Sequence, residues 1–123
     1  MKTLFTLLLV TLSFVSFSQT KLIESTFKKA IAKGVVVVEF NAPFNVKNSF
    51  KDYKELEHCN YYKVCVVGSP SLKKKYRITS YPTLLVFKSG YVEKKYKGNI
   101  MLELDVTTKE LQEAVDELYL DKF

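Results

Sequence analysis

The 123 residues of the chain are enough for one domain with its own hydrophobic core. The formal net charge is +6, and 18 of the 19 basic side chains are lysines. Arginine is the usual residue for bidentate phosphate recognition, so the composition argues against nucleic-acid binding. Attraction to an anionic surface or an acidic partner stays open, because residues 19–102 hold 16 basic and 6 acidic side chains. Residues 103–123 reverse this balance, with 2 basic and 7 acidic side chains.

The N-terminal segment has the pattern of a secretory signal peptide. Lys2 precedes an apolar run from Leu4 to Phe17, and Ser16 and Ser18 are small residues at the −3 and −1 positions of a cleavage site. A transmembrane anchor is the alternative, but the run is shorter than the ~20 residues that span a bilayer. We expect residues 1–18 to be removed by cleavage after Ser18. Residues 19–123 would then form one secreted or periplasmic domain without a stable membrane anchor.

The exported chain is predicted to begin with a helix and a buried strand. The helix starts near residue 19, takes its N-cap from Thr20 or Ser25, and ends before Gly34. The run Val35–Phe40 is apolar apart from Glu39, which is typical of a strand buried on both faces of a sheet. A buried carboxylate is costly without partners, so Glu39 is a candidate functional residue.

Further elements follow in the order helix, strand, helix, hairpin and helix. After a loop over residues 41–44, apolar spacing predicts a helix from near Asn45 to about His58, with Val46 and Phe50 on its inner stripe. Strands are predicted over residues 62–67, 83–88 and 91–97, and a short basic helix over residues 71–76. Thr107 and Glu110 have the spacing of a capping box at the start of the last helix. This order predicts an α/β fold with a mixed central sheet of four to five strands and helices on both faces.

The stretches VVVEFNAPF and YRITSYPTLLVFKSG, followed by Gly98, resemble the thioredoxin superfamily over almost the whole exported chain. The resemblance implies the thioredoxin-like fold. It places Tyr81-Pro82-Thr83 at the loop that carries a cis proline beside the active site. It also aligns Glu39 with the family's buried acid and Lys63 with a lysine on the neighbouring strand, which makes Lys63 a candidate partner of Glu39.

The active-site motif of the family is missing from this chain. Members with redox activity have Cys-x-x-Cys directly after the loop aromatic, where this chain has Asn45-Val46-Lys47-Asn48. Disulfide exchange requires a thiolate and a second, resolving thiol, and an amide supplies neither. We therefore expect no catalytic residue at Asn45 or Asn48, and an N-cap role for Asn45. Whether the protein is an enzyme stays open, with the sequence favouring a protein that is not.

A binding surface for protein partners is the function that the resemblance leaves. In the family, the backbone before the cis proline pairs with an extended substrate peptide, and that contact needs no thiol. The expected binding residues are Phe44, Asn45, Val46, Tyr81 and Pro82, and the expected partner is an extended segment of an exported or envelope protein. Alternatively, Phe44 and Tyr81 only pack the loop.

The remaining candidates are the two cysteines, Cys59 and Cys65. They are expected as two separate thiols, with Cys65 in the core, although a disulfide between them stays open. An oxidoreductase or isomerase that works through these cysteines is the rival function. A structural subunit of an envelope complex is the second alternative. No metal site is expected, because His58 beside Cys59 gives two adjacent ligands and no others nearby, and no other cofactor is implied.

Overall fold

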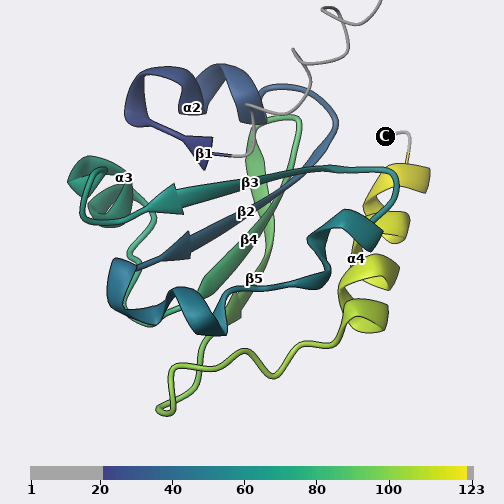
Figure 1. Ribbon diagram of the computed structural model, residues 1–123. Coiled ribbons are helices and arrows are strands. Elements are labelled where there is room, and N and C mark those ends of the chain that lie inside the picture. The colour runs from purple at the N-terminus through teal and green to yellow at the C-terminus, as the bar shows by residue number, and fades with distance from the viewer. Residues whose placement is uncertain (1–20, 122–123) are drawn as a thin grey trace, which may run out of the picture.

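The computed structural model describes residues 21–121, which form a five-stranded mixed sheet with helical segments on both faces (Figure 1). The predicted signal peptide lies outside the described residues. The strand order is β1-β3-β2-β4-β5. The strands are β1 Lys21–Leu22, β2 Val35–Asn41, β3 Asn60–Cys65, β4 Thr83–Lys88 and β5 Tyr91–Lys97. The helices are α2 Glu24–Ile31, α3 Pro70–Lys75 and α4 Thr108–Leu120, and the short 3₁₀ helices are η2 Pro43–Asn48 and η3 Asp52–Glu55.

Strand β2 is the centre of the fold, as its apolar run predicts. All seven of its residues are buried, and it pairs parallel with β3 and antiparallel with β4. Because side chains alternate along a strand, Val36, Val38 and Phe40 pack in one core with α2 and α3. Val35 and Val37 pack in a second core on the other face, with α4. The α/β architecture expected from the sequence, a mixed central sheet with helices on both faces, is confirmed.

The start of the domain differs from the prediction. Lys21 and Leu22 pair with β3 as a strand, and helix α2 begins only at Glu24. Ile23 is its N-cap residue and no side chain caps the helix, so the cap predicted from Ser25 is wrong. Thr20 lies outside the described residues. Gly34 has a φ of 70° and turns the chain from α2 into β2, in line with its predicted role after the helix.

The second predicted helix is also wrong. Residues 43–55 form the two short 3₁₀ helices η2 and η3, with extended backbone at Ser49 and Leu56. The physical reason is that Asn45 and Ser49 hydrogen-bond to other segments instead of extending a helix. Val46, expected on the inner stripe, is 65% exposed, whereas Phe50 is buried as predicted. His58, with a φ of 65°, leads into β3, which starts and ends two residues before the predicted bounds.

The C-terminal half follows the prediction closely. The hairpin of β4 and β5 has the expected bounds, and the basic helix α3 is displaced by one residue. The Thr107 hydroxyl accepts a hydrogen bond from the backbone N–H of Glu110 at 3.1 Å and so caps α4 as predicted. Leu111 and Val115 on the apolar face of α4 are fully buried. No helix in the described range is long and apolar enough to cross a membrane.

Candidate functional site

One end of the sheet gathers four loops that are distant in the sequence. The parallel strands β2 and β3 both finish at this end, where Asn41 is the register partner of Cys65. The antiparallel strand β4 starts here and β5 finishes here, where Thr83 is the register partner of Lys97. The loops after β2, β3 and β5 and the loop before β4 therefore lie together, and this end holds the binding residues predicted from the sequence.

Three asparagines hold the loop after β2. The Asn41 side chain accepts hydrogen bonds from the Ala42 N–H at 2.9 Å and from the Asn45 amide at 3.1 Å, and it donates to the Asn45 carbonyl at 3.0 Å. Asn45 also donates to the carbonyl of Leu102 at 3.2 Å and accepts from the Asn48 amide at 2.9 Å. This network links η2 to the loop after β5.

The two positions that carry cysteine in redox-active relatives are thus occupied by hydrogen-bonded amides. Asn45 is only 2% exposed, and its φ and ψ of −116° and 20° interrupt η2. The N-cap role expected for Asn45 is wrong, because it starts no helix and its side chain bonds to Asn41, Asn48 and Leu102 instead. The loop forms the short 3₁₀ helix η2, and no α-helix starts within it.

The loop before β4 carries a cis peptide bond between Tyr81 and Pro82, as the resemblance implied. Gly98 packs directly on this loop, and its N–H donates to the Pro82 carbonyl at 2.7 Å. A Cβ at position 98 would overlap the Tyr81 carbonyl and lie 2.9 Å from the Pro82 oxygen. Only glycine allows this close approach of the two backbones.

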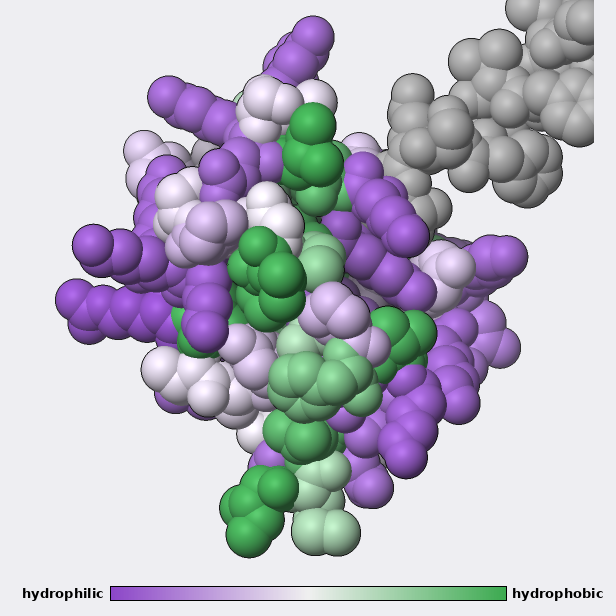
Figure 2. All heavy atoms as spheres, turned by 60° about the vertical axis from the view of Figure 1, so that its left-hand side comes forward, coloured by the Kyte–Doolittle hydropathy of each residue, from purple (hydrophilic) through white to green (hydrophobic). Residues whose placement is uncertain are grey.

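An apolar surface surrounds this loop. The Phe44 ring is 70% exposed and meets the half-buried Tyr81 ring edge-on, with the centroids 6.0 Å apart. Val46 is exposed beside Phe44 in η2, and Ile100 and Met101 are exposed in the loop after β5. Figure 2 shows apolar side chains in a band across this end of the molecule, between clusters of hydrophilic ones. A soluble domain seldom exposes so many large apolar groups together without a partner.

Sequence reasoning found Phe44, Val46 and Tyr81 but missed Ile100 and Met101. The available signal was a pair of large apolar residues that closely follows Gly98, within a predicted loop. Loops are normally polar, so an apolar pair at that place indicates either burial or an interface. Ile100 is 94% exposed, so burial is excluded and an interface is the remaining explanation.

Glu39 is buried beneath the loop, and its hydrogen-bond partners do not include the candidate Lys63. One carboxylate oxygen accepts from the Ser49 hydroxyl at 2.6 Å, and the other accepts from the Phe50 N–H at 2.6 Å and the Tyr61 hydroxyl at 3.0 Å. Burial, together with the Glu39 charge, holds the pKa of Tyr61 far above its ordinary value, so this phenol stays a donor.

The candidate pair of Glu39 and Lys63 does not form, although the two residues are register partners on β2 and β3. The Lys63 ammonium lies 4.5 Å from the centroid of the Tyr53 ring instead. The physical reason is that Ser49, Phe50 and Tyr61 already supply three donors to the carboxylate. The buried acid therefore ties the segment after η2 to the sheet.

Comparison with known proteins places this geometry in a family. The Thioredoxin family profile matches residues 18–113. The chain belongs to the thioredoxin family. A thioredoxin of Malassezia sympodialis has 19% sequence identity and a TM-score of 0.57, covering 83% of this chain and 91% of its own. A point mutant of a Halobacterium salinarum thioredoxin has 16% identity and a TM-score of 0.64, covering 80% and 88%. A designed protein has 22% identity and a TM-score of 0.59, covering 86% and 96%.

The cysteines of this thioredoxin family chain are poorly placed to replace the missing dithiol. Cys59 and Cys65 are free, and they flank β3 at opposite ends, roughly 20 Å apart at the rise of an extended strand. A disulfide needs Cα atoms within about 7 Å, so the bridge left open by the sequence does not fit this geometry. Burial and the nearby Asp116 charge raise the pKa of Cys59 to about 11, which disfavours its thiolate. Cys65 is exposed, so its predicted place in the core is wrong.

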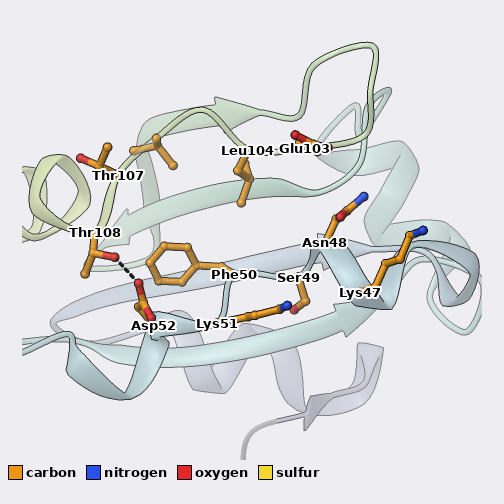
Figure 3. A pocket seen from close by; sticks show the side chains of 11 residues that line it. Lys47, Asn48, Ser49, Phe50, Lys51, Asp52, Glu103, Leu104, Thr107 and Thr108 are labelled. Carbon is orange, nitrogen blue, oxygen red and sulfur yellow. Dashed lines mark hydrogen bonds between the residues drawn. The ribbon is translucent and has the colours of Figure 1, made fainter.

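A polar hollow of about 490 Å³ adjoins the asparagine network (Figure 3). Its walls are residues 47–52, 103, 104 and 106–108, and the Thr108 hydroxyl joins the two walls by donating to the Asp52 carboxylate at 2.8 Å. The lining holds two lysines, Lys47 and Lys51, and two acids, Asp52 and Glu103, so the hollow favours neither charge. No group of three or more potential metal ligands occurs within residues 21–121.

Proposed function

We propose that this protein is an exported member of the thioredoxin family that binds extended segments of partner proteins and does not exchange disulfides. The observation that carries the proposal is the exposed apolar surface formed by Phe44, Val46, Tyr81, Ile100 and Met101 around the Tyr81–Pro82 loop. Amides held in hydrogen bonds stand where dithiol chemistry would need two cysteines. The binding surface persists without the chemistry.

The backbone of Tyr81 supplies the polar part of this surface. Within residues 21–121, neither its N–H nor its carbonyl takes part in a hydrogen bond. An extended peptide laid across the loop gains main-chain hydrogen bonds from such a free backbone edge, while its side chains enter the neighbouring apolar surface. Phe44 and Tyr81 offer flat, rigid aromatic area, which is the usual anchor of a protein interface.

The test is binding to an array of extended peptides, with unfolded, carboxymethylated ribonuclease as a second probe. We expect Phe44→Ala and Tyr81→Asp each to weaken binding about tenfold or more, in the range of interface anchors. Tyr91→Ala is the matched control. The Tyr91 side chain is about as exposed as that of Phe44, but it lies on the β4–β5 hairpin at the opposite end of β5. Unchanged peptide binding by both the Phe44→Ala and the Tyr81→Asp variants would refute this binding surface.

The rival function is tested by insulin reduction and by the refolding of scrambled ribonuclease. A protein that only binds gives no turnover above buffer in either assay. Turnover that Cys59→Ser abolishes would replace the proposal with an oxidoreductase or isomerase. A structural subunit of an envelope complex predicts instead an association that weakens strongly with salt and is indifferent to Tyr81→Asp.

A further inference from the structure

A cleft of about 450 Å³ lies at the β1–β3 edge of the sheet, apart from the Tyr81 loop. This volume is within the range of small-molecule sites, roughly 300–1,000 Å³. Its lining is mainly apolar and comes from three segments: the start of the fold, the entry to η2, and β3. The apolar lining residues are Leu22, Ile23, Ala42, Pro43, Val46 and Val64.

The cleft follows from the way the chain leaves β2. A continuous helix after the loop would lie on the sheet, whereas η2 and η3 are short and separated by extended backbone at Ser49. Ser49 is drawn to Glu39, and both residues line the cleft. Space therefore opens between η2 and the edge strands, at a place where the sequence predicts packed helix.

Two lysines give the cleft its charge. Lys21 and Lys63 both line it, and they are register partners on the adjacent strands β1 and β3. Like charges opposite each other destabilise a strand pair unless a counter-charge lies nearby. The only acid in the lining is Glu39, whose oxygens are taken by three donors. Neither lysine forms an ion pair within residues 21–121, and the Lys63 ammonium contacts the Tyr53 ring, which does not neutralise its charge.

We propose that this cleft binds a small amphipathic anion, namely an apolar carboxylate of the medium-chain fatty acid class. Leu22 and Val64 pack in the core on the other face of the sheet, so the acyl chain lies against the exposed lining residues Ile23, Pro43 and Val46. The carboxylate lies between the ammonium groups of Lys21 and Lys63. An apolar cavity with two cations that lack a carboxylate partner at one strand edge matches this ligand in both polarity and charge. The site is separate from the peptide surface around Tyr81, although Val46 borders both.

Cys65 provides a direct readout, because it lines the cleft and is exposed. In a Cys59→Ser variant it is the one remaining thiol of the chain. We expect decanoate to slow alkylation of Cys65 by N-ethylmaleimide, a neutral reagent, in a saturable manner. Calorimetric titration with decanoate should give the same affinity. Octanoate should bind more weakly, by about fourfold for each CH₂ removed.

Matched variants and ligands distinguish binding in this cleft from non-specific hydrophobic binding. Lys21→Gln and Lys63→Gln should each weaken decanoate binding, by roughly fivefold, whereas Lys109→Gln on α4 should leave it unchanged. Decan-1-ol, which lacks the charge, should protect Cys65 poorly. Equal protection by decan-1-ol, or no protection by decanoate, would overturn the proposal. Phe44→Ala should retain decanoate binding, so failure of the peptide surface and failure of this cleft are distinguishable.

Discussion

Single residues decide what the end of the sheet can do. Asn45 has the size and place of a reactive side chain, but its amide is buried and hydrogen-bonded on both sides. An amide with both N–H donors and its oxygen engaged serves best as a structural tie, since breaking one of these bonds leaves a buried polar group unpaired. The amides that stand where redox-active relatives have two cysteines therefore hold the loop that carries Phe44 in place.

Gly98 is the residue where the backbone leaves least room. We expect Gly98→Ala to lower the free energy of unfolding by about 1–3 kcal/mol, because the added Cβ overlaps the Tyr81 carbonyl. Urea denaturation measures this change. Gly68→Ala is the matched control, since its Cβ meets only the Cys65 carbonyl at 3.8 Å and should cost far less. Equal stability of the two variants would show that the loop before β4 can shift to admit the added Cβ at little cost in free energy.

Individual elements show where sequence patterns succeed and where they fail. The strands β2 and β4 and the helix α4 were predictable, because apolar runs and a capping box are local signals that burial and Thr107 reinforce. The segment 43–58 was not, because its apolar spacing is helical while its polar groups bond to distant partners. Ser49 reaches Glu39 and Asn45 reaches Leu102, and no local pattern records such contacts.

Helix α4 also holds the segment that leads into β3. Asp116 accepts hydrogen bonds from the His58 ring at 3.1 Å and from the Gln112 amide at 2.8 Å, and these bonds lower the pKa of its carboxyl. A lowered pKa in the folded state means that the carboxylate stabilises the fold above its ordinary value of about 3.8. This stabilisation is lost as the pH falls through the lowered value.

We therefore expect Asp116→Asn to be less stable than the wild type at pH 6, with the gap closing as the pH falls below the ordinary carboxyl range. Urea denaturation between pH 2 and pH 6 measures it. Glu113→Gln is the control, because Glu113 is exposed on the same helix. A gap that stays constant with pH would assign the effect to packing and exclude the Asp116 charge.

The whole molecule was easier to predict than its site. Strand order and layers follow from the sequence of apolar elements, and the stretches around Glu39 and Pro82 carry the family pattern. The site depends on loops brought together by that topology, so Ile100 and the cleft between Lys21 and Lys63 appear only in three dimensions. Long-range contacts, and not local propensity, determine the position of Ile100 and the shape of the cleft.

The destination of the protein is the last property of the whole chain that can be tested. Strand β1 starts at Lys21, so cleavage after Ser18 leaves every described element intact, with two residues to spare. In a Gram-negative bacterial host we expect the protein in the periplasm, with Gln19 as its N-terminal residue by intact mass and N-terminal sequencing. Ser18→Tyr places a bulky side chain at the −1 position and should leave residues 1–18 attached. Thr20→Tyr, beyond the cleavage site, is the control. A protein that retains Met1 in the wild type would refute export through a cleaved signal, and with it the exported partner, while leaving the peptide surface to be judged by its own variants.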